Sequence, residues 1–83
     1  MIKINTVLAI RIRILQLCDE KGLTINKLAT ISAVPPSSIK NILYGKSKDP
    51  RITTIKKICD GLEITLGQFF NTPDFDNLEQ EII

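Results

Sequence analysis

Apolar residues recur at helical spacing near the start of the chain and predict a first helix over 6–21. Five of them fall within one arc of about 100° on a helical wheel. They form the expected core face: Val7, Ile10, Ile14, Leu17 and Cys18. Asn5 or Thr6 can cap the start of this helix. Gly22 lies just past its end, where a left-handed residue often stands.

A second apolar stripe lies well round from this core face, at Leu8, Ile12 and Leu15. Together the two stripes span about 220°, which is too wide for a helix that packs on one side only. Either the segment Met1–Ile4 or the C-terminus folds over the second stripe, or the stripe is a surface for self-association. The pattern favours neither explanation.

Two shorter helices are predicted over 24–32 and 35–44. Thr24 is a good N-cap residue for the first of them. The second begins near the proline pair at positions 35 and 36, because proline suits the first helical turn, and it stops at Gly45. The turn between the two helices is about three residues long, which is the geometry of a helix-turn-helix.

The remaining pattern predicts a fourth helix over 52–61, with Gly61 at its end, and a fifth short helix that starts at Thr65. The expected fold class is therefore all-α, a compact bundle of five short helices. We expect a domain over 1–72, followed by an acidic tail over 73–83. The apolar residues of that tail are possible docking points: Phe75, Leu78, Ile82 and Ile83.

The helix over 35–44 has one apolar face and one polar face. Its apolar residues share an arc of about 100°, and they are Ile39, Ile42 and Leu43. The polar face on the opposite side contains Ser37, Lys40, Asn41 and Tyr44. Any solvated surface helix can show such a face, but the second helix of a helix-turn-helix enters the major groove of DNA.

The side chains of this polar face suit DNA. Asn can make a bidentate pair with adenine, and Lys can donate to guanine or to phosphate. Ser can bond a base or the backbone, and Tyr44 can reach a phosphate or a sugar. Lys46, Ser47 and Lys48 follow at once, so we expect them beside the groove, where lysines neutralise phosphates.

Charge is unevenly distributed along the chain, although the net charge is only +2. Residues 40–57 carry six basic side chains and one acidic one, whereas residues 58–83 carry six acidic side chains and no basic one. This polarity is expected where one face of a protein meets a polyanion. Ordinary solvated charge is the alternative.

Residue composition argues against catalysis. The chain has no histidine, the commonest general base. Its two cysteines, Cys18 and Cys59, are too far apart to predict a metal site by spacing. Each lies in an apolar helical pattern, so we expect two small buried hydrophobes. We therefore expect a protein that is not an enzyme and that has no cofactor and no metal.

The 83 residues are enough for one domain. No apolar run approaches the roughly 18–20 residues that span a membrane. The start of the chain, Met1–Asn5, has no signal-peptide pattern. We expect a soluble, cytoplasmic protein that does not enter a membrane.

The stretch from Arg13 to Phe70 resembles the Cro/C1-type (XRE-like) helix-turn-helix family of phage repressors and bacterial regulators. The most characteristic part runs from Pro35 to Lys48. Further matching residues are Arg13, Ile14, Leu17, Gly22, Leu23, Thr24, Leu28, Ala29, Val34, Pro50, Ile55, Ile58, Leu62, Ile64, Leu66 and Phe69. The resemblance implies a lambda-repressor-like bundle and sequence-specific binding of double-stranded DNA.

Carried over by position, the resemblance implies base contacts from Pro36, Ser37, Lys40 and Asn41. It implies contacts to the DNA backbone from the start of the second helix and from the residues after the third. With Ser47 from the reasoning above, the expected backbone set is Thr24, Tyr44, Lys46, Ser47 and Lys48.

The chain departs from the family pattern at three places. Many members have Gln at position 25, where it contacts the DNA backbone, but this chain has Ile25, which puts that contact in doubt. Many have Gly in the interhelical turn, where this chain has Ala33; a left-handed backbone there would cost alanine about 1 kcal/mol. An ion pair between the first and third helices is replaced by Cys18 and Leu43, which predicts that these helices still touch.

The resulting hypothesis is a transcriptional regulator, a repressor-type protein that binds operator DNA as a homodimer. Its half-sites would then lie one DNA turn apart, about 34 Å. The second stripe of the first helix and the apolar end of the tail are the candidate dimer surfaces. The alternative is an antitoxin or adaptor that uses the same fold to bind a protein partner, because a fold alone does not fix function.

Overall fold

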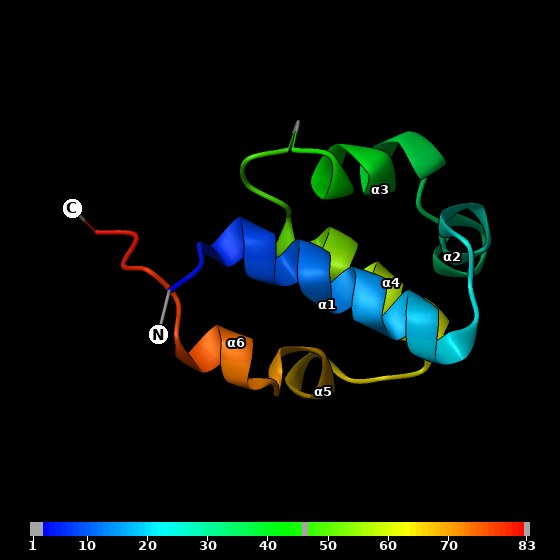
Figure 1. Ribbon diagram of the computed structural model, residues 1–83. Coiled ribbons are helices and arrows are strands. Elements are labelled where there is room, and N and C mark those ends of the chain that lie inside the picture. The colour runs from blue at the N-terminus through cyan, green and yellow to red at the C-terminus, as the bar shows by residue number, and fades with distance from the viewer. Residues whose placement is uncertain (1–2, 46, 83) are drawn as a thin grey trace.

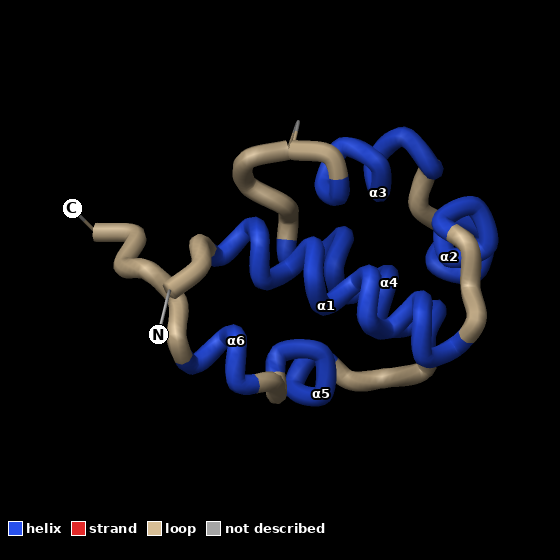
Figure 2. Tube along the Cα trace, in the orientation of Figure 1, coloured by secondary structure: helices blue, strands red, loops and turns tan. Residues whose placement is uncertain are grey.

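The computed structural model describes residues 3–45 and 47–82, and these form helices joined by loops (Figure 2). The helices are α1 (Thr6–Lys21), α2 (Ile25–Ser32), α3 (Pro36–Leu43), α4 (Ile52–Leu62), α5 (Leu66–Phe70) and α6 (Pro73–Asp76). Figure 1 shows α1 running across the front of the molecule, with α3 above it and α5 and α6 below it. Within the described part of the chain, no helix has the length and apolarity needed to cross a membrane.

The starts of three helices are set by local side-chain caps. Asn5 accepts a hydrogen bond from the N–H of Leu8 at the start of α1, and Thr24 accepts one from Lys27 at the start of α2. Thr65 and Gln68 form a reciprocal capping box at α5. The helix starts predicted at these positions are confirmed.

Three helices also end in the same left-handed turn. The left-handed residue is Gly22 after α1, Ala33 after α2 and Glu63 after α4. In each case the N–H of the next residue bonds to the carbonyl five positions earlier, at 2.8–3.1 Å, which is a Schellman motif. Ala33 therefore adopts the left-handed conformation, with φ 53°, at the turn where the sequence resemblance led us to expect glycine.

The core lies between α1, α2, α3, α4 and α5. Its fully buried side chains are Phe69, Ile14, Leu28, Ile39, Ile55, Ile58 and Cys59. Cys18 is buried as well, and burial raises the pKa of both thiols. The prediction of two small buried hydrophobes is confirmed, and a raised pKa leaves little reactive thiolate.

The sequence pattern predicted that the fourth helix ends at Gly61, and this prediction is wrong. The helix continues to Leu62, and Gly61 lies where α4 packs against α2. A Cβ atom on Gly61 would lie 2.6 Å from the Oγ of Ser32 and 2.8 Å from the carbonyl oxygen of Ile31. This glycine is therefore needed for the close approach of two helices, not for a turn.

The described residues form six helices where five were expected, because the segment predicted as tail includes α6. Phe75 of α6 packs edge-on against Phe70 of α5, with ring centroids 4.9 Å apart. Beyond α6, Leu78 forms a parallel bridge with Ile4, and the N–H of Glu79 donates to the Ile4 carbonyl at 2.9 Å. Phe75 and Leu78 thus dock as predicted, whereas Ile82 is 88% exposed and Ile83 lies outside the described residues.

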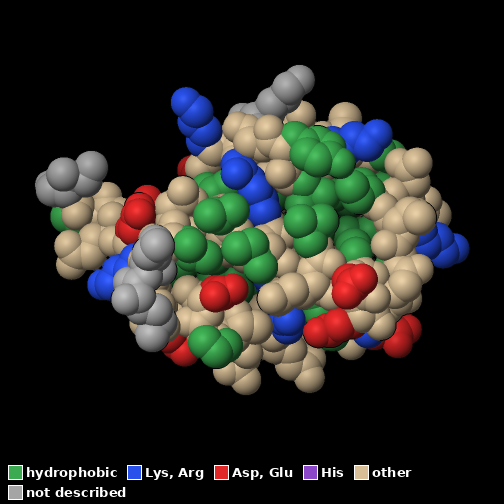
Figure 3. Space-filling view, in the orientation of Figure 1, with side chains coloured by type: hydrophobic (Ala, Val, Ile, Leu, Met, Phe, Trp, Pro, Cys, Tyr) green, Lys and Arg blue, Asp and Glu red, His purple; other side chains and the backbone are tan. Residues whose placement is uncertain are grey.

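The second apolar stripe of α1 is only partly buried. Leu15 remains 51% exposed and Leu8 36% exposed, while Ile12 is half-buried. In Figure 3 hydrophobic side chains gather on the face that α1 crosses (Figure 3). The C-terminal segment folds against α1, which α6 contacts. Leu8 and Leu15 of the second stripe nevertheless stay open to solvent.

Candidate nucleic-acid interface

The exposed face of α3 contains every residue predicted to read bases. Ile39, Ile42 and Leu43 of this helix are buried in the core. Pro36, Ser37, Lys40 and Asn41 are all exposed, and Tyr44, which follows the helix, is 68% exposed. One side of α3 is therefore committed to packing, and the other is free to meet a ligand.

The turn between α2 and α3 sets the orientation of the exposed face of α3. Ala33 and the buried Val34 turn the chain between the two helices, and Pro36 occupies the first turn of α3. Thr24 is exposed at the start of α2, where the first N–H groups of a helix lack partners within it. Ile25 stands where the resemblance implies Gln, and its side chain is half-buried against the core.

Arg11 ties α1 to the C-terminal end of α3. Its Nε donates a hydrogen bond of 2.7 Å to the carbonyl oxygen of Ile42, and this contact is half-buried. A cation at the last carbonyls of a helix also interacts favourably with the helix dipole. Cys18 and Leu43 are both buried and α1 contacts α3, so the predicted contact between these helices is confirmed.

Sequence reasoning missed Arg11 because its position, between the two apolar stripes of α1, gives no sign of its partner. Arg13, on the other side of α1, also bonds to backbone carbonyls of a neighbouring helix. Its guanidinium donates to the carbonyl oxygens of Phe69 and Gln68, at 2.7 and 2.9 Å. The two arginines therefore fasten α3 and α5 to opposite sides of α1.

The loop after α3 folds back onto the helix. The N–H of Ser47 donates to the carbonyl oxygen of Asn41 at 2.8 Å, and Ser47 is half-buried. Lys48 is exposed, as expected for a phosphate contact. Lys46, also predicted to contact the DNA backbone, lies outside the described residues.

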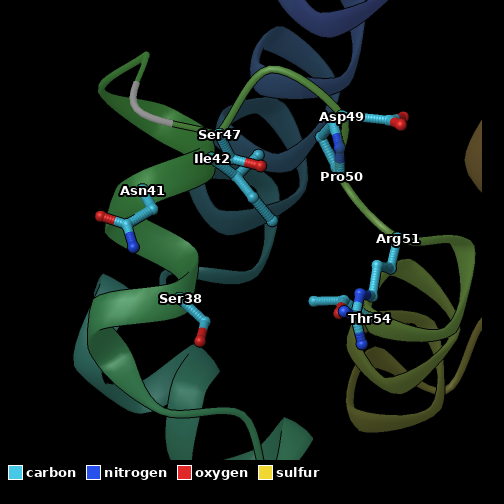
Figure 4. Close-up of a pocket in the computed structure, with 8 residues that line it drawn as sticks. All are labelled: Ser38, Asn41, Ile42, Ser47, Asp49, Pro50, Arg51 and Thr54. Carbon is cyan, nitrogen blue, oxygen red and sulfur yellow. The ribbon is translucent and has the colours of Figure 1, made fainter.

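A groove of about 200 Å³ separates α3 from the start of α4. Figure 4 shows Ser38 and Ile42 of α3 on one side and Arg51 and Thr54 on the other, with Asn41 on the outer side of α3 (Figure 4). Asn41 and Ser47, which also line the groove, were predicted as site residues, but its other polar residues were not: Ser38, Asp49, Arg51 and Thr54. The sequence did carry a signal for Arg51, which belongs to the basic segment 40–57 and directly precedes a helix.

The basic side chains around α3 form no ion pair with any carboxylate in the described part of the chain. Within residues 3–45 and 47–82, the only ion pair joins Lys56 and Asp60, both on α4. Lys40, Lys48 and Arg51 are exposed. Their charge is therefore available to a polyanion at the face of α3.

The sequence that forms α2, the turn and α3 matches a known protein family. A match to the Cro/C1-type helix-turn-helix DNA-binding domain covers residues 13–74. The chain belongs to the Cro/C1-type helix-turn-helix DNA-binding family. The match runs from within α1 into α6, so it includes both helices of the motif and the helices that support them.

Two individual proteins are similar to this Cro/C1-type chain. One is the HTH-type transcriptional repressor RghR of Bacillus subtilis (strain 168), which is 44% identical over 46 residues. Those residues are 55% of this chain and 34% of RghR, so the chain spans about a third of that relative's length. The other is the prophage Lp1 protein 11, whose crystal structure matches with a TM-score of 0.79 at 31% identity, over 90% of this chain and 99% of that one.

Proposed function

We propose that this protein is a transcriptional regulator that binds operator DNA by placing α3 in the major groove. The observation that supports the proposal is the division of α3 into a buried apolar face and an exposed polar face. A helix anchored in this way can bring side chains to base edges without losing its own packing. Membership of a DNA-binding family and similarity to a repressor support the same conclusion.

In this proposal Asn41 and Lys40 read base edges, and Ser37 and Pro36 contact bases at the start of α3. Asn presents a donor and an acceptor that suit adenine, and Lys donates to guanine or to phosphate. Asn41 is the residue most suited to discriminate, because only a bidentate pair fixes both the base and its orientation.

The remaining predicted residues would hold the DNA backbone. Thr24 and the N–H groups at the start of α2 face one strand, and Tyr44, Lys46, Ser47 and Lys48 lie after α3. Arg51 adds a further cation across the groove from Ser38. Such contacts position the helix but carry no sequence information themselves.

We further propose that the protein binds as a homodimer. A single domain of this size makes few base contacts, and two copies would read half-sites about 34 Å apart. The stripe of Leu8, Ile12 and Leu15 is one candidate interface, because Leu8 and Leu15 stay exposed on α1. The end of the C-terminal segment at Ile82 is the other. A mass measurement that finds only monomer at high micromolar concentration would contradict this part of the proposal.

The test of the whole proposal is selection of random DNA duplexes by the purified protein, followed by sequencing. Enrichment of a two-fold symmetric motif would support a dimeric, sequence-specific regulator and would give the half-site spacing. Enrichment of a single half-site would support DNA reading by a monomer. If the folded protein enriches no sequence, the proposal is wrong.

A second candidate function is an adaptor or antitoxin that binds a protein partner. It is favoured by the exposed stripe of α1 and by Ile25, which removes a polar side chain from the start of α2. The salt dependence of DNA binding distinguishes the two functions. A regulator should lose affinity steeply as salt rises, whereas an adaptor should have little DNA affinity to lose.

A further inference from the structure

The C-terminal segment holds a carboxylate against the N-terminal end of α1. The Oγ of Thr6 donates a hydrogen bond of 2.7 Å to the Oε2 of Glu81. The backbone fixes this position, because Leu78 bridges Ile4 and the N–H of Glu79 donates to the Ile4 carbonyl. A carboxylate is favoured at this end of a helix, where the dipole is positive.

The same carboxylate lies beside the loop that carries Lys48. Lys48 and Glu81 both line a hollow of about 310 Å³ next to Thr6 and Val7, and both line a second hollow of about 260 Å³ next to Asn5. The start of α1, the loop after α3 and the C-terminal segment therefore converge at one place. Figure 1 shows this loop above the start of α1 and the C-terminal segment running to the left of both.

Two other charged groups line these hollows. Arg11 lines the second hollow, but its guanidinium donates to the Ile42 carbonyl. Asp49 lines the first hollow and belongs to the same loop as Lys48. Glu81 is thus the one acidic side chain that the C-terminal segment brings to both hollows.

We propose that residues 77–82 form an acidic strap that competes with DNA phosphates for Lys48. The proposal rests on the function proposed above, in which Lys48 contacts the DNA backbone. Glu81 and Lys48 line the same two hollows, and exposed charges interact over about 8 Å at physiological salt. A phosphate that approaches Lys48 must then overcome the nearby negative charge. The strap lowers affinity for all sequences alike and leaves discrimination to α3.

The experiment compares Glu81→Gln with Glu20→Gln, which changes the net charge equally at the far end of α1. Affinity for a mixed-sequence DNA duplex is measured by fluorescence anisotropy at several salt concentrations. Glu81→Gln should bind about two- to five-fold tighter than the natural protein, the scale of one exposed charge interaction. Its salt dependence should also be steeper, since Lys48 is then free to displace counterions. Glu20→Gln should change neither quantity to the same extent.

Two outcomes of this comparison would overturn the strap. Equal tightening by both variants would show a general charge effect without a local competitor. Weaker binding by Glu81→Gln would show that Glu81 positions Lys48 for DNA instead of masking it.

A second measurement reports on the strap without DNA. The rate at which an acylating reagent modifies the Lys48 amine, followed by mass spectrometry, should rise in Glu81→Gln and stay unchanged in Glu20→Gln, because only Glu81 lines the hollows beside Lys48. An unchanged rate in Glu81→Gln overturns the strap, whatever the DNA affinity does. If the rate rises but no variant binds DNA, the proposed function itself fails, and the competition with phosphate fails with it.

Discussion

The interface between α2 and α4 and the outer face of α3 make opposite demands on their side chains. At the interface, Gly61 leaves no space for a Cβ atom, and the hydroxyl of Ser32 is buried without a hydrogen-bond partner. On α3, the side chains of Ser37, Lys40 and Asn41 are exposed, and none bonds to another described group. Few substitutions at the α2–α4 interface should therefore be compatible with folding. Substitutions on the outer face of α3 should not affect folding.

This contrast separates stability from recognition within two neighbouring elements of the motif. The α2–α4 contact holds the first helix of the motif in place, and α3 presents its polar face from that support. Substitutions at the interface should lower the free energy of unfolding, whereas substitutions on the outer face should change only DNA binding.

The largest expected effect comes from Gly61→Ala. The added methyl group would meet the Ile31 carbonyl, which cannot move without its helix, so we expect a loss of about 3 kcal/mol in the free energy of unfolding, the upper range for overpacking. Gly67→Ala is the control, because a Cβ atom there meets only the Thr65 hydroxyl at an ordinary 3.7 Å. Urea unfolding measures both. Equal stability of the two variants would contradict the close approach of α2 and α4.

Asn41→Ala should leave stability nearly unchanged and should weaken DNA binding. The side chain is exposed and unpaired, so stability should change by less than about 0.5 kcal/mol. Loss of a bidentate base contact should weaken binding to the selected sequence by about 2 kcal/mol and relax preference at one position. Repeating the duplex selection with the variant tests this. Unchanged affinity and preference would show that this face of α3 does not read bases.

Arg11→Gln tests whether the outer face of α3 depends on the bond that holds α3 to α1. Loss of the charged hydrogen bond to Ile42 should lower stability by about 1.5 kcal/mol and should also weaken DNA binding, because the end of α3 is released. Arg13→Gln should cost similar stability through α5 but should leave DNA binding unchanged. Thermal unfolding and anisotropy together measure both effects. Equal losses of DNA affinity would argue against a specific role for Arg11 in holding α3.

The smallest expected effect is a gain. Ala33→Gly should raise the free energy of unfolding by about 0.5–1 kcal/mol, because glycine adopts the left-handed conformation without the strain of a Cβ atom. Ala29→Gly, in the buried interior of α2, is the opposite control and should destabilise. Chemical denaturation compares the two variants. A loss of stability in Ala33→Gly would show that the alanine side chain has a packing role.

Much of the fold could be predicted from local sequence. Asn5, Thr24 and Thr65 set helix starts through hydrogen bonds that span three residues, so their effect does not depend on the rest of the chain. The two faces of α3 follow from helical periodicity alone. The specific roles of the α3 side chains in reading DNA stay predictions.

Contacts between distant segments could not be predicted in the same way. Gly61 has the local appearance of a helix end, and only the position of α2 shows that it is a contact point. Glu63 ends α4 in a left-handed conformation that no local signal favours, and its neighbour Ile64 packs against the core. The return of residues 73–79 onto α1 likewise depends on Phe70 and Ile4, which are far apart in the chain.

The sequence by itself determined where most helices begin and which of their faces are apolar, because capping and periodicity act within a few residues. The tertiary structure decided which carbonyls Arg11 and Arg13 reach, where a glycine is required and which carboxylate stands near Lys48. Those features depend on the distance between elements that are remote in sequence, and such distances are fixed only when the helices pack together.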